Sequence, residues 1–195
     1  MTHVDQRDLG ILDAATSGSR QGGPSFSRGH RLVRVVWTVA WTLLAAWTPA
    51  PLHRWRALLL RLFGARLFGN VRVHGSARIW YPPNLVMDEN SLIGRGAIVY
   101  NIAPIRIGKG AIVSQGAHLC TGTHVIDDPS FQLTASPIVI GADAWIAAEA
   151  FVGPGVVIGE GAVLGARGVA FRDIPAWSVY AGNPARLLRR RTTNP

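Results

Sequence analysis

Residues 140–169 read IGADAWIAAEAFVGPGVVIGEGAVLGARGV and place an aliphatic side chain at every sixth position. The series consists of Ile140, Ile146, Val152, Ile158 and Leu164. A period of six fits neither an amphipathic helix nor an alternating strand, and repetition at a fixed period indicates a solenoid. Three hexads make one triangular coil, so we expect each hexad to supply one flat side and one corner, with its first residue directed into the prism.

The same period extends towards the N-terminus as far as Val73, with two slips of two residues and one longer break. Glycine commonly follows the first position, where we expect it to relieve the steric cost of a tight corner. Alanine recurs at the fifth position and is expected to fill the remaining interior space. The longer break is THVIDDPSFQLTASP at 123–137, which we expect to leave the solenoid as a loop and to carry function.

Several stretches outside the plain hexads make the sequence more specific: HRWRALLLRLFGA, IVYNIAPIRIG, LCTGTHVIDDPSF, PIVIGADAWIAAEAFVGPGVVIGEGAVLGA and AGNPARLLRRR. Through them residues 32–191 resemble the hexapeptide-repeat acyltransferases, most closely the branch of colanic-acid and exopolysaccharide biosynthesis acetyltransferases. The resemblance implies a left-handed parallel β-helix and a homotrimer. It also implies direct transfer of an acetyl group from acetyl-CoA to a sugar hydroxyl.

Composition divides the chain into four parts. Residues 1–30 have few periodic hydrophobics and are expected to be a disordered tail. Residues 31–69 are expected to form a hydrophobic and basic helical hairpin. The all-β solenoid, a β-helix of hexapeptide repeats with a loop at 125–138, is assigned to residues 70–182. A short basic C-terminal tail, residues 183–195, completes the chain.

The helical hairpin has two interpretations. It caps the open end of the solenoid, or residues 32–63 make a peripheral membrane contact with tryptophans at the lipid interface and arginines on anionic headgroups. The uninterrupted apolar part, 35–47, is shorter than the roughly 20 residues that span a bilayer, and Pro49 and Pro51 stop any helix. A spanning helix is therefore not expected.

His124 ends the last regular hexad before the break, and the resemblance implies that it removes the proton from the acceptor hydroxyl. Histidine suits a general base because it exchanges protons near neutral pH. Either Asp127 or Asp128 would orient the imidazole, or both are ordinary loop carboxylates ahead of Pro129. Asn101 is implied to contact the acceptor, with a corner asparagine in left-handed conformation as the alternative.

The resemblance also assigns contacts to acetyl-CoA, which is expected as the co-substrate, with no metal. Trp145 of the AWI motif is assigned to the fifth position of its hexad, where small residues otherwise predominate, so it either lines the pantetheine cleft or fills the core. The remaining contacts are the backbone amides near Ala147, Gly165 and Ala166, and, towards the adenosine end, Asn183, Pro184, Arg186 and Arg189.

The formal net charge of +9 is compatible with nucleic acid, anionic lipid or an anionic cofactor as partner. The basic residues lack an interleaved aromatic platform, which argues against nucleic acid. A single cysteine, Cys120, excludes an intramolecular disulfide. The N-terminus does not resemble a signal peptide. We therefore expect a cytoplasmic enzyme, at the inner face of the cytoplasmic membrane if the hairpin is an anchor and the acceptor is lipid-linked.

Two other classes of function stay open. One is a non-catalytic β-helix scaffold. The other is a metal-dependent lyase of the hexad-built carbonic anhydrase type, in which His118 and His124, one hexad apart, share a zinc ion that normally needs three protein ligands. A covalent route through Cys120 is a further alternative, although no neighbouring residue in the sequence suggests an activated thiol.

Overall fold

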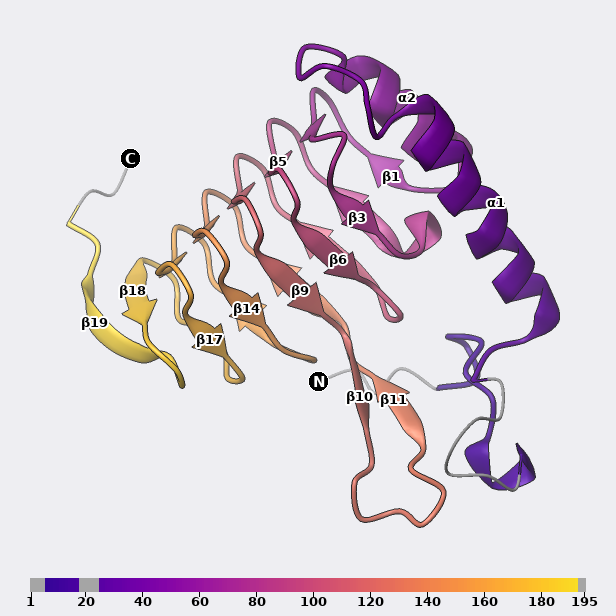
Figure 1. The fold of residues 1–195 in the computed structure, drawn as a ribbon. Helices are drawn as coiled ribbons and strands as arrows, with labels where there is room; N and C mark the ends of the chain where they lie inside the picture. Colours follow the sequence, from indigo (N-terminus) through magenta and orange to yellow (C-terminus); the bar gives the residue numbers. More distant parts are fainter. Residues whose placement is uncertain (1–5, 18–24, 193–195) are drawn as a thin grey trace.

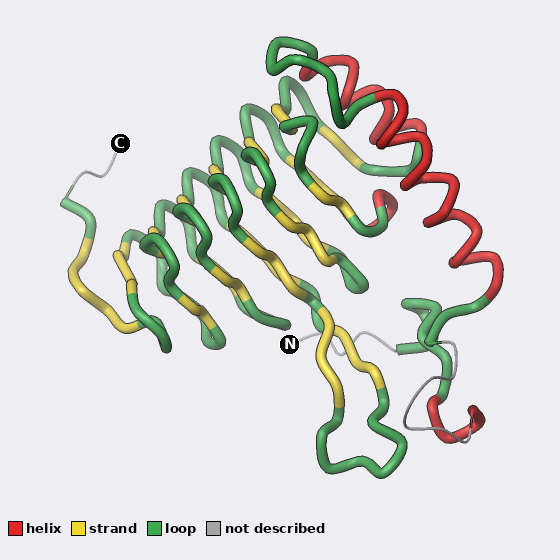
Figure 2. Tube along the Cα trace, in the orientation of Figure 1, coloured by secondary structure: helices red, strands yellow, loops and turns green. Residues whose placement is uncertain are grey.

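The structure is a computed structural model that describes residues 6–17 and 25–192, and its short strands coil around one axis (Figure 1). Three sheets run along the solenoid, and successive coils contribute one strand to each. The corners between the strands are the loops of Figure 2. The strand pairs that join neighbouring coils are parallel, as in β4 with β7 and β9 with β14. The predicted all-β solenoid of hexapeptide repeats is confirmed.

Each side of the prism is one sheet. The first side contains β1 (Arg66–Leu67), β4 (Leu85–Met87), β7 (Ile105–Ile107), β12 (Ile138–Ile140) and β15 (Val157–Ile158). The second contains β2 (Arg72–Val73), β5 (Leu92–Ile93), β8 (Ile112–Val113), β13 (Trp145–Ile146), β16 (Val163–Leu164), β18 (Ser178–Ala181) and β19 (Arg186–Arg190). The third contains β3 (Arg78–Ile79), β6 (Ile98–Tyr100), β9 (His118–Cys120), β14 (Phe151–Val152) and β17 (Val169–Ala170).

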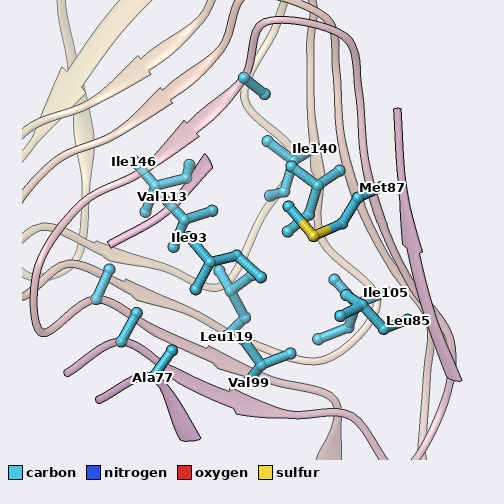
Figure 3. Close-up of a cluster of buried hydrophobic side chains, with 14 of the residues drawn as sticks. Ala77, Leu85, Met87, Ile93, Val99, Ile105, Val113, Leu119, Ile140 and Ile146 are labelled. Atoms are coloured by element: carbon cyan, nitrogen blue, oxygen red, sulfur yellow. The ribbon is translucent and has the colours of Figure 1, made fainter. Parts of the chain in front are cut away.

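First-position aliphatic residues form the core. Ile93, Val113 and Ile146 face one another in register on β5, β8 and β13 and are fully buried. Figure 3 shows these three in one row, with Val99 and Leu119 on a neighbouring side. Burial of such a side chain contributes about 1.5–3 kcal/mol, and the stack repeats in every coil. The interior is therefore the source of the solenoid's stability.

Glycine stands at the second hexad position for a different reason from the predicted one. At the second hexad position a side chain would meet the backbone of the next coil, since a Cβ on Gly141 would lie 2.6 Å from the Glu160 nitrogen. The left-handed conformation occurs instead at the fourth position, for example at Gly96 and Gly161 (φ 65° and 61°). Glycine at the second position therefore allows close approach of two coils rather than a positive φ.

The solenoid begins earlier than the predicted boundary at residue 70. Strand β1 pairs with β4, and Leu67, six residues before Val73, is buried in the same phase. Residues 66–69 therefore belong to the first coil and not to the helical hairpin.

Helices α1 (Arg28–Leu44) and α2 (His53–Leu62) lie side by side across the N-terminal end of the solenoid (Figure 1). The Trp37 indole donates a 2.7 Å hydrogen bond to the Ile79 carbonyl, and the Trp41 indole donates to the Gly75 carbonyl at 3.1 Å. Both rings are buried against the first coil. The helical hairpin therefore caps the solenoid, and this leaves its outward side available for other contacts.

Arg56 locks the cap to the solenoid. Its side chain is fully buried, and its guanidinium donates to the Val73 carbonyl at 2.6 Å, the Ala50 carbonyl at 2.6 Å and the Thr48 hydroxyl at 2.8 Å. A buried cation is tolerated when its donors are satisfied. Arg56 donates to carbonyl and hydroxyl oxygens of the α1–α2 connection and of β2.

The predicted basic tail is in large part a strand. Strand β19 pairs antiparallel with β18, across a turn at Gly182 (φ 93°). The Arg191 amide donates to the Trp177 carbonyl at 2.8 Å, and its guanidinium lies 5.5 Å from the Trp177 ring centroid. The prediction of a tail from 183 is therefore wrong as far as Arg191. This strand could not be predicted from the hexad pattern, because RLLRR has no hexad phase.

The predicted disordered tail also needs correction within the described residues. Residues 6–17, which we call the N-terminal arm, contain a short 3₁₀ helix at Ala14–Ser17 and a β-bridge from Ile11 to Phe26. Both bridge residues are buried in a second apolar cluster with Ile102 and Leu133. These few contacts order a segment that has no periodicity. The parts of the expected tail at 1–5 and 18–24 lie outside the described residues.

Candidate active site

The break in the hexads forms a β-hairpin. Strands β10 (Gly122–His124) and β11 (Leu133–Ala135) pair antiparallel, with His124 opposite Leu133, and the hairpin projects away from the solenoid (Figure 1). We call residues 122–135 the excursion. Its first residue lies close to the preceding coil, because a Cβ on Gly122 would lie 2.7 Å from the Ile102 Cδ1 atom. The predicted loop is thus a hairpin whose base packs closely on the preceding coil.

His124 is exposed, and its tautomer is fixed. The Nδ1 atom lies 2.8 Å from the Phe131 carbonyl oxygen, and the His124 and Phe131 rings stack at 4.4 Å with 13° between their planes. A carbonyl oxygen only accepts hydrogen bonds, so Nδ1 carries the proton in this contact. In the neutral ring Nε2 then keeps its lone pair. His124 is consequently arranged to accept a proton at Nε2.

The carboxylates of the excursion do not touch His124. Asp128 accepts a 2.8 Å hydrogen bond from the Ser130 amide, which makes it a turn former, and the Phe131 amide donates to its carbonyl at 2.8 Å. For Asp127, no contact with the imidazole occurs among the described residues. The orienting role expected for Asp127 or Asp128 therefore passes to the Phe131 carbonyl. Sequence reasoning missed Phe131 because a backbone oxygen leaves no side-chain signature.

Asn101 is a structural residue in this geometry. It is fully buried, its Oδ1 accepts from the Tyr81 amide at 3.0 Å, and its Nδ2 donates to the Tyr81 carbonyl at 2.8 Å. Its backbone is not left-handed either, so neither sequence interpretation is correct. The side chain pairs with extended backbone one coil away and is shielded from an acceptor.

The N-terminal arm holds the excursion from its outer edge. Gln6 exchanges two hydrogen bonds with the backbone of Ala135, at 3.2 and 2.9 Å, as a neighbouring strand would. From the excursion, Gln132 accepts from the Ala14 amide at 2.6 Å and donates to the Leu12 carbonyl at 3.2 Å. Neither glutamine belongs to a motif, so the sequence offered no signal for this contact.

Trp145 lies on the outside of the prism. Counted from Ile140 it is the sixth residue of its hexad, and the interior position belongs to Ala144, which is 1% exposed. The Trp145 ring is 47% exposed, and its Nε1 donates to the Ser114 hydroxyl at 2.8 Å. The core-filling alternative is therefore wrong, and a fixed indole is presented on the flank of the solenoid.

The other residues expected beside the pantetheine lie on adjacent coils. Ala147 donates its amide to the Leu164 carbonyl at 2.9 Å, and Gly165 donates its amide to the Tyr180 carbonyl at 2.7 Å. Those two amides are used within the solenoid, which corrects their expected role as donors to a ligand. The Ala166 amide has no hydrogen-bond partner among the described residues. Gly165 is still required to be small, since its Cβ would lie 2.9 Å from that of Ala181.

The residues expected near the adenosine end gather at the last coil. Pro184 and Arg186 line a surface hollow together with Phe171 and Arg172. Asn183 precedes this hollow, and Arg189 lies further along exposed β19, paired with Val179. The two groups of expected contacts, around Trp145 and around Arg186, therefore lie on different coils of the solenoid.

The bacterial transferase hexapeptide family (six repeats) matches residues 137–169. A relative from Escherichia coli (strain K12), named as a colanic acid biosynthesis acetyltransferase, is 41% identical to this chain over 169 residues. The match covers 86% of this chain and 93% of the relative. The chain belongs to the hexapeptide-repeat acetyltransferases. The family resemblance predicted from the TGTH, AWI and AGNPAR motifs is confirmed. The assignment to the acyltransferase class of enzymes is confirmed as well.

Solved hexapeptide-repeat acetyltransferases have the same left-handed β-helix fold as this chain. One from Vibrio cholerae, complexed with acetyl coenzyme A, is 20% identical with a TM-score of 0.80 and covers 97% of this chain and 100% of its own. A galactoside acetyltransferase in complex with coenzyme A is 23% identical with a TM-score of 0.77 and covers 86% of this chain and 84% of its own. The likeness extends over most of the chain.

Cys120 and His118, the other reactive side chains near the excursion, are partly shielded in this acetyltransferase. Burial raises the pKa of the Cys120 thiol, whose Sγ lies 3.4 Å from the Gly122 carbonyl oxygen. Burial lowers the pKa of His118, which contacts the Phe151 ring edge to face at 5.3 Å. Within residues 6–17 and 25–192 no three histidine, cysteine or acidic side chains gather as a metal site. The covalent and zinc-lyase alternatives therefore gain no support.

Proposed function

We propose that this enzyme transfers an acetyl group from acetyl-CoA to a hydroxyl of a sugar, directly and with His124 as the general base. The observation that carries the proposal is the fixed tautomer of His124, whose Nε2 lone pair is exposed while Nδ1–H is held by the Phe131 carbonyl. A general base needs a defined, unprotonated nitrogen within reach of the acceptor. The structures of relatives bound to coenzyme A or acetyl-CoA support the choice of donor.

Each group in the proposed step has a defined part. Acetyl-CoA supplies the acyl group as a thioester. His124 Nε2 accepts the proton of the sugar hydroxyl while that oxygen forms a bond to the acetyl carbon, and the carbon–sulfur bond breaks. The imidazolium returns the proton to the departing thiolate. The Phe131 carbonyl accepts from Nδ1–H throughout and stabilises the positive ring. General-base assistance of this kind contributes about 10²–10⁴-fold.

We place the donor along the flank that carries Trp145. The exposed indole and the Ala166 amide, which no described residue binds, support a pantetheine arm lying on adjacent coils. The small residues Ala147 and Gly165 leave room for it. The hollow lined by Pro184, Arg186 and Arg172 supports an anionic adenosine end, because arginine pairs with phosphate through two parallel hydrogen bonds. Asn183 and Arg189 extend this surface.

We propose a homotrimer with the donor site at the boundary between prisms. Trp145 lies in register with Ile112, and both are more than 40% exposed on a flat solenoid side. A neighbouring prism would cover these apolar side chains. Equilibrium sedimentation of the full chain should give three times the 21.0 kDa mass. A monomer at micromolar concentration would contradict this assembly.

The acceptor class rests on the relatives. The name of the Escherichia coli relative refers to colanic acid biosynthesis, which supports a sugar destined for exopolysaccharide, either soluble or lipid-linked, in the cytoplasm or at the inner membrane face. A non-catalytic scaffold is the competing function. It is disfavoured because a scaffold has no use for an exposed histidine whose tautomer is fixed by Phe131.

The deciding experiment compares His124→Ala with the wild type. The variant should fold with an unchanged thermal midpoint and bind coenzyme A in a calorimeter, since His124 is exposed. Acetyl transfer to sugar acceptors should fall by about 10²–10⁴-fold. Retention of near-full activity would overturn the base assignment. Failure of the wild type to bind coenzyme A at millimolar concentration would favour the scaffold.

A matched variant separates the ring contact from the base. Phe131→Ala removes the stacked ring but keeps the carbonyl that fixes Nδ1–H. We expect a loss of activity of up to about tenfold, because an aromatic stack contributes roughly 0.5–1.5 kcal/mol. A loss as large as that of His124→Ala would mean that the ring positions the acceptor as well.

A further inference from the structure

Helix α1 is apolar on the side that faces away from the solenoid. Its inward side buries Trp37 and Trp41 against the first coil. Its outward side presents Leu32 (64% exposed), Val35 (59%), Val39 (52%) and Leu43 (64%). A helix that is apolar on both sides is ordinarily enclosed by other structure. Only its inward side is enclosed here.

Exposed apolar side chains also lie on the elements next to α1. We define the outer helical face as the exposed side chains Leu32, Val35, Val36, Val39, Leu43, Leu44, Trp47, Leu58 and Leu62. Trp47 is 74% and Leu62 is 72% exposed. The Trp55 indole donates to the Leu44 carbonyl at 2.7 Å and so ties α2 to the end of α1. Exposed apolar side chains gathered on two adjacent helices mark an interaction surface.

The segment of the sequence that forms this face carries charge of one sign. Between Asp13 and Asp88 the sequence contains ten arginines and no aspartate or glutamate, whereas the rest of the chain has ten basic and eleven acidic residues. The entire net positive charge of the protein therefore resides in residues 14–87, a range that includes the cap and the first coil. A surface of anionic charge would be attracted to this end of the molecule.

Arginines and apolar side chains share the same surface hollows. Arg28 and Arg31 line one hollow with Leu32, Val35 and Val39. A second hollow is lined by Arg54 and Arg61 together with Trp55 and Leu58. Such mixing suits a boundary where a hydrocarbon layer meets phosphate groups, because arginine can bury its stem and keep its charge at the phosphate.

We propose that the outer helical face docks on the surface of an anionic phospholipid bilayer, with α1 lying in the plane of the interface. A helix of 17 residues is about 25 Å long. None of the helices that the structure describes could cross a bilayer. Interfacial helices bind through buried apolar area and through attraction of basic residues to anionic lipid. The inference does not depend on acetyl transfer.

Charge argues against a second copy of the chain as the occupant. Two such faces brought together would set the arginines of one against the arginines of the other, with no carboxylate between residues 14 and 87 to pair with them. Like charges in contact oppose association. An anionic lipid surface satisfies both the apolar and the basic component.

The test measures co-sedimentation of the full chain with unilamellar vesicles. Vesicles of phosphatidylcholine with 30 mol% phosphatidylglycerol should bind the protein at 0.1 M NaCl, and binding should weaken steeply as salt rises. Val39→Asp should reduce the affinity at least tenfold. Val157→Asp is the matched control, since Val157 has a similar exposure, 41%, but lies on strand β15 of the prism. It should bind as the wild type does.

Two further measurements test the folding of the variants and the contribution of the arginines. Thermal midpoints verify that both aspartate variants fold, and Arg28→Gln with Arg31→Gln should lower the salt dependence without touching the apolar side chains. Equal binding of the two aspartate variants would overturn the proposal, as would equal binding to pure phosphatidylcholine or none to anionic vesicles. Loss of self-association in Val39→Asp would assign the face to a second copy instead.

Discussion

In the solenoid, Ile146 is fully buried and lies in register between Val113 and Leu164 of the adjoining coils. In the excursion, His124 is exposed and is held by one hydrogen bond and one ring contact with Phe131. The solenoid is stabilised by many equivalent contacts that repeat along the chain. The excursion depends on a few contacts that occur once, including those from the N-terminal arm. On the proposed function, stability and chemistry are carried by different parts of the molecule, and variants should separate them.

The largest effect is expected in the solenoid interior. Ile146→Ala should lower the free energy of unfolding by about 2–5 kcal/mol, because the cavity lies between two fixed coils. Activity per folded molecule should remain near that of the wild type. Chemical denaturation measures the first quantity. Ile126→Ala, at a side chain 71% exposed in the excursion, is the control and should leave stability unchanged. Equal destabilisation by both would remove the distinction between the two regions.

The second variant probes the flank of the solenoid. Trp145→Ala should raise the KM for acetyl-CoA about tenfold, equivalent to 1.4 kcal/mol of binding, with little change in stability because the ring is 47% exposed. Steady-state kinetics with a saturating acceptor measures the change. Trp47→Ala removes an indole that is more exposed but lies at the cap, and it should leave KM unchanged. A loss of stability without a change in KM would make Trp145 structural.

The third variant acts on the excursion from a distance. Gln6→Ala removes two hydrogen bonds to Ala135. A net loss of about 1 kcal/mol would speed amide exchange of β10 and β11 roughly fivefold. The solenoid strands should exchange as before. Hydrogen exchange with mass detection resolves the two regions. Gln115→Ala, at an exposed solenoid corner, is the matched control, and equal protection in both variants would show that the arm does not brace the excursion.

The smallest effect is expected at the excursion carboxylates. Asp127→Asn should leave kcat within about twofold, since the Phe131 carbonyl fixes His124. Asp128→Asn keeps an oxygen that can accept from the Ser130 amide and should behave alike. Kinetics across a pH series is the measurement. A loss of two orders of magnitude in either variant would restore the carboxylate to the orienting role.

The same comparison explains which features could be predicted. Burial in a solenoid imposes one residue class at each sixth position, so the interior around Ile93 and Ile146 was readable from the spacing alone. The excursion has no such constraint. Its register, the carbonyl of Phe131 and the glutamine contacts of the arm depend on backbone atoms that any residue supplies. The role of His124 is proposed from resemblance and stays a prediction, and Asn101 was misassigned because burial cannot be read from one asparagine.

Strand β19 has a consequence for the association of whole molecules. The ends of a solenoid expose strand edges, and uncovered edges invite copies to stack into fibres. Here α1 and α2 cover one end, and β19 occupies the outer edge of the longest sheet at the other with Arg186, Arg189 and Arg190 exposed. Both ends are therefore basic, and head-to-tail polymerisation meets electrostatic repulsion. Repulsion between the basic ends opposes the growth of filaments. Concentrated salt should screen this repulsion and weaken its effect.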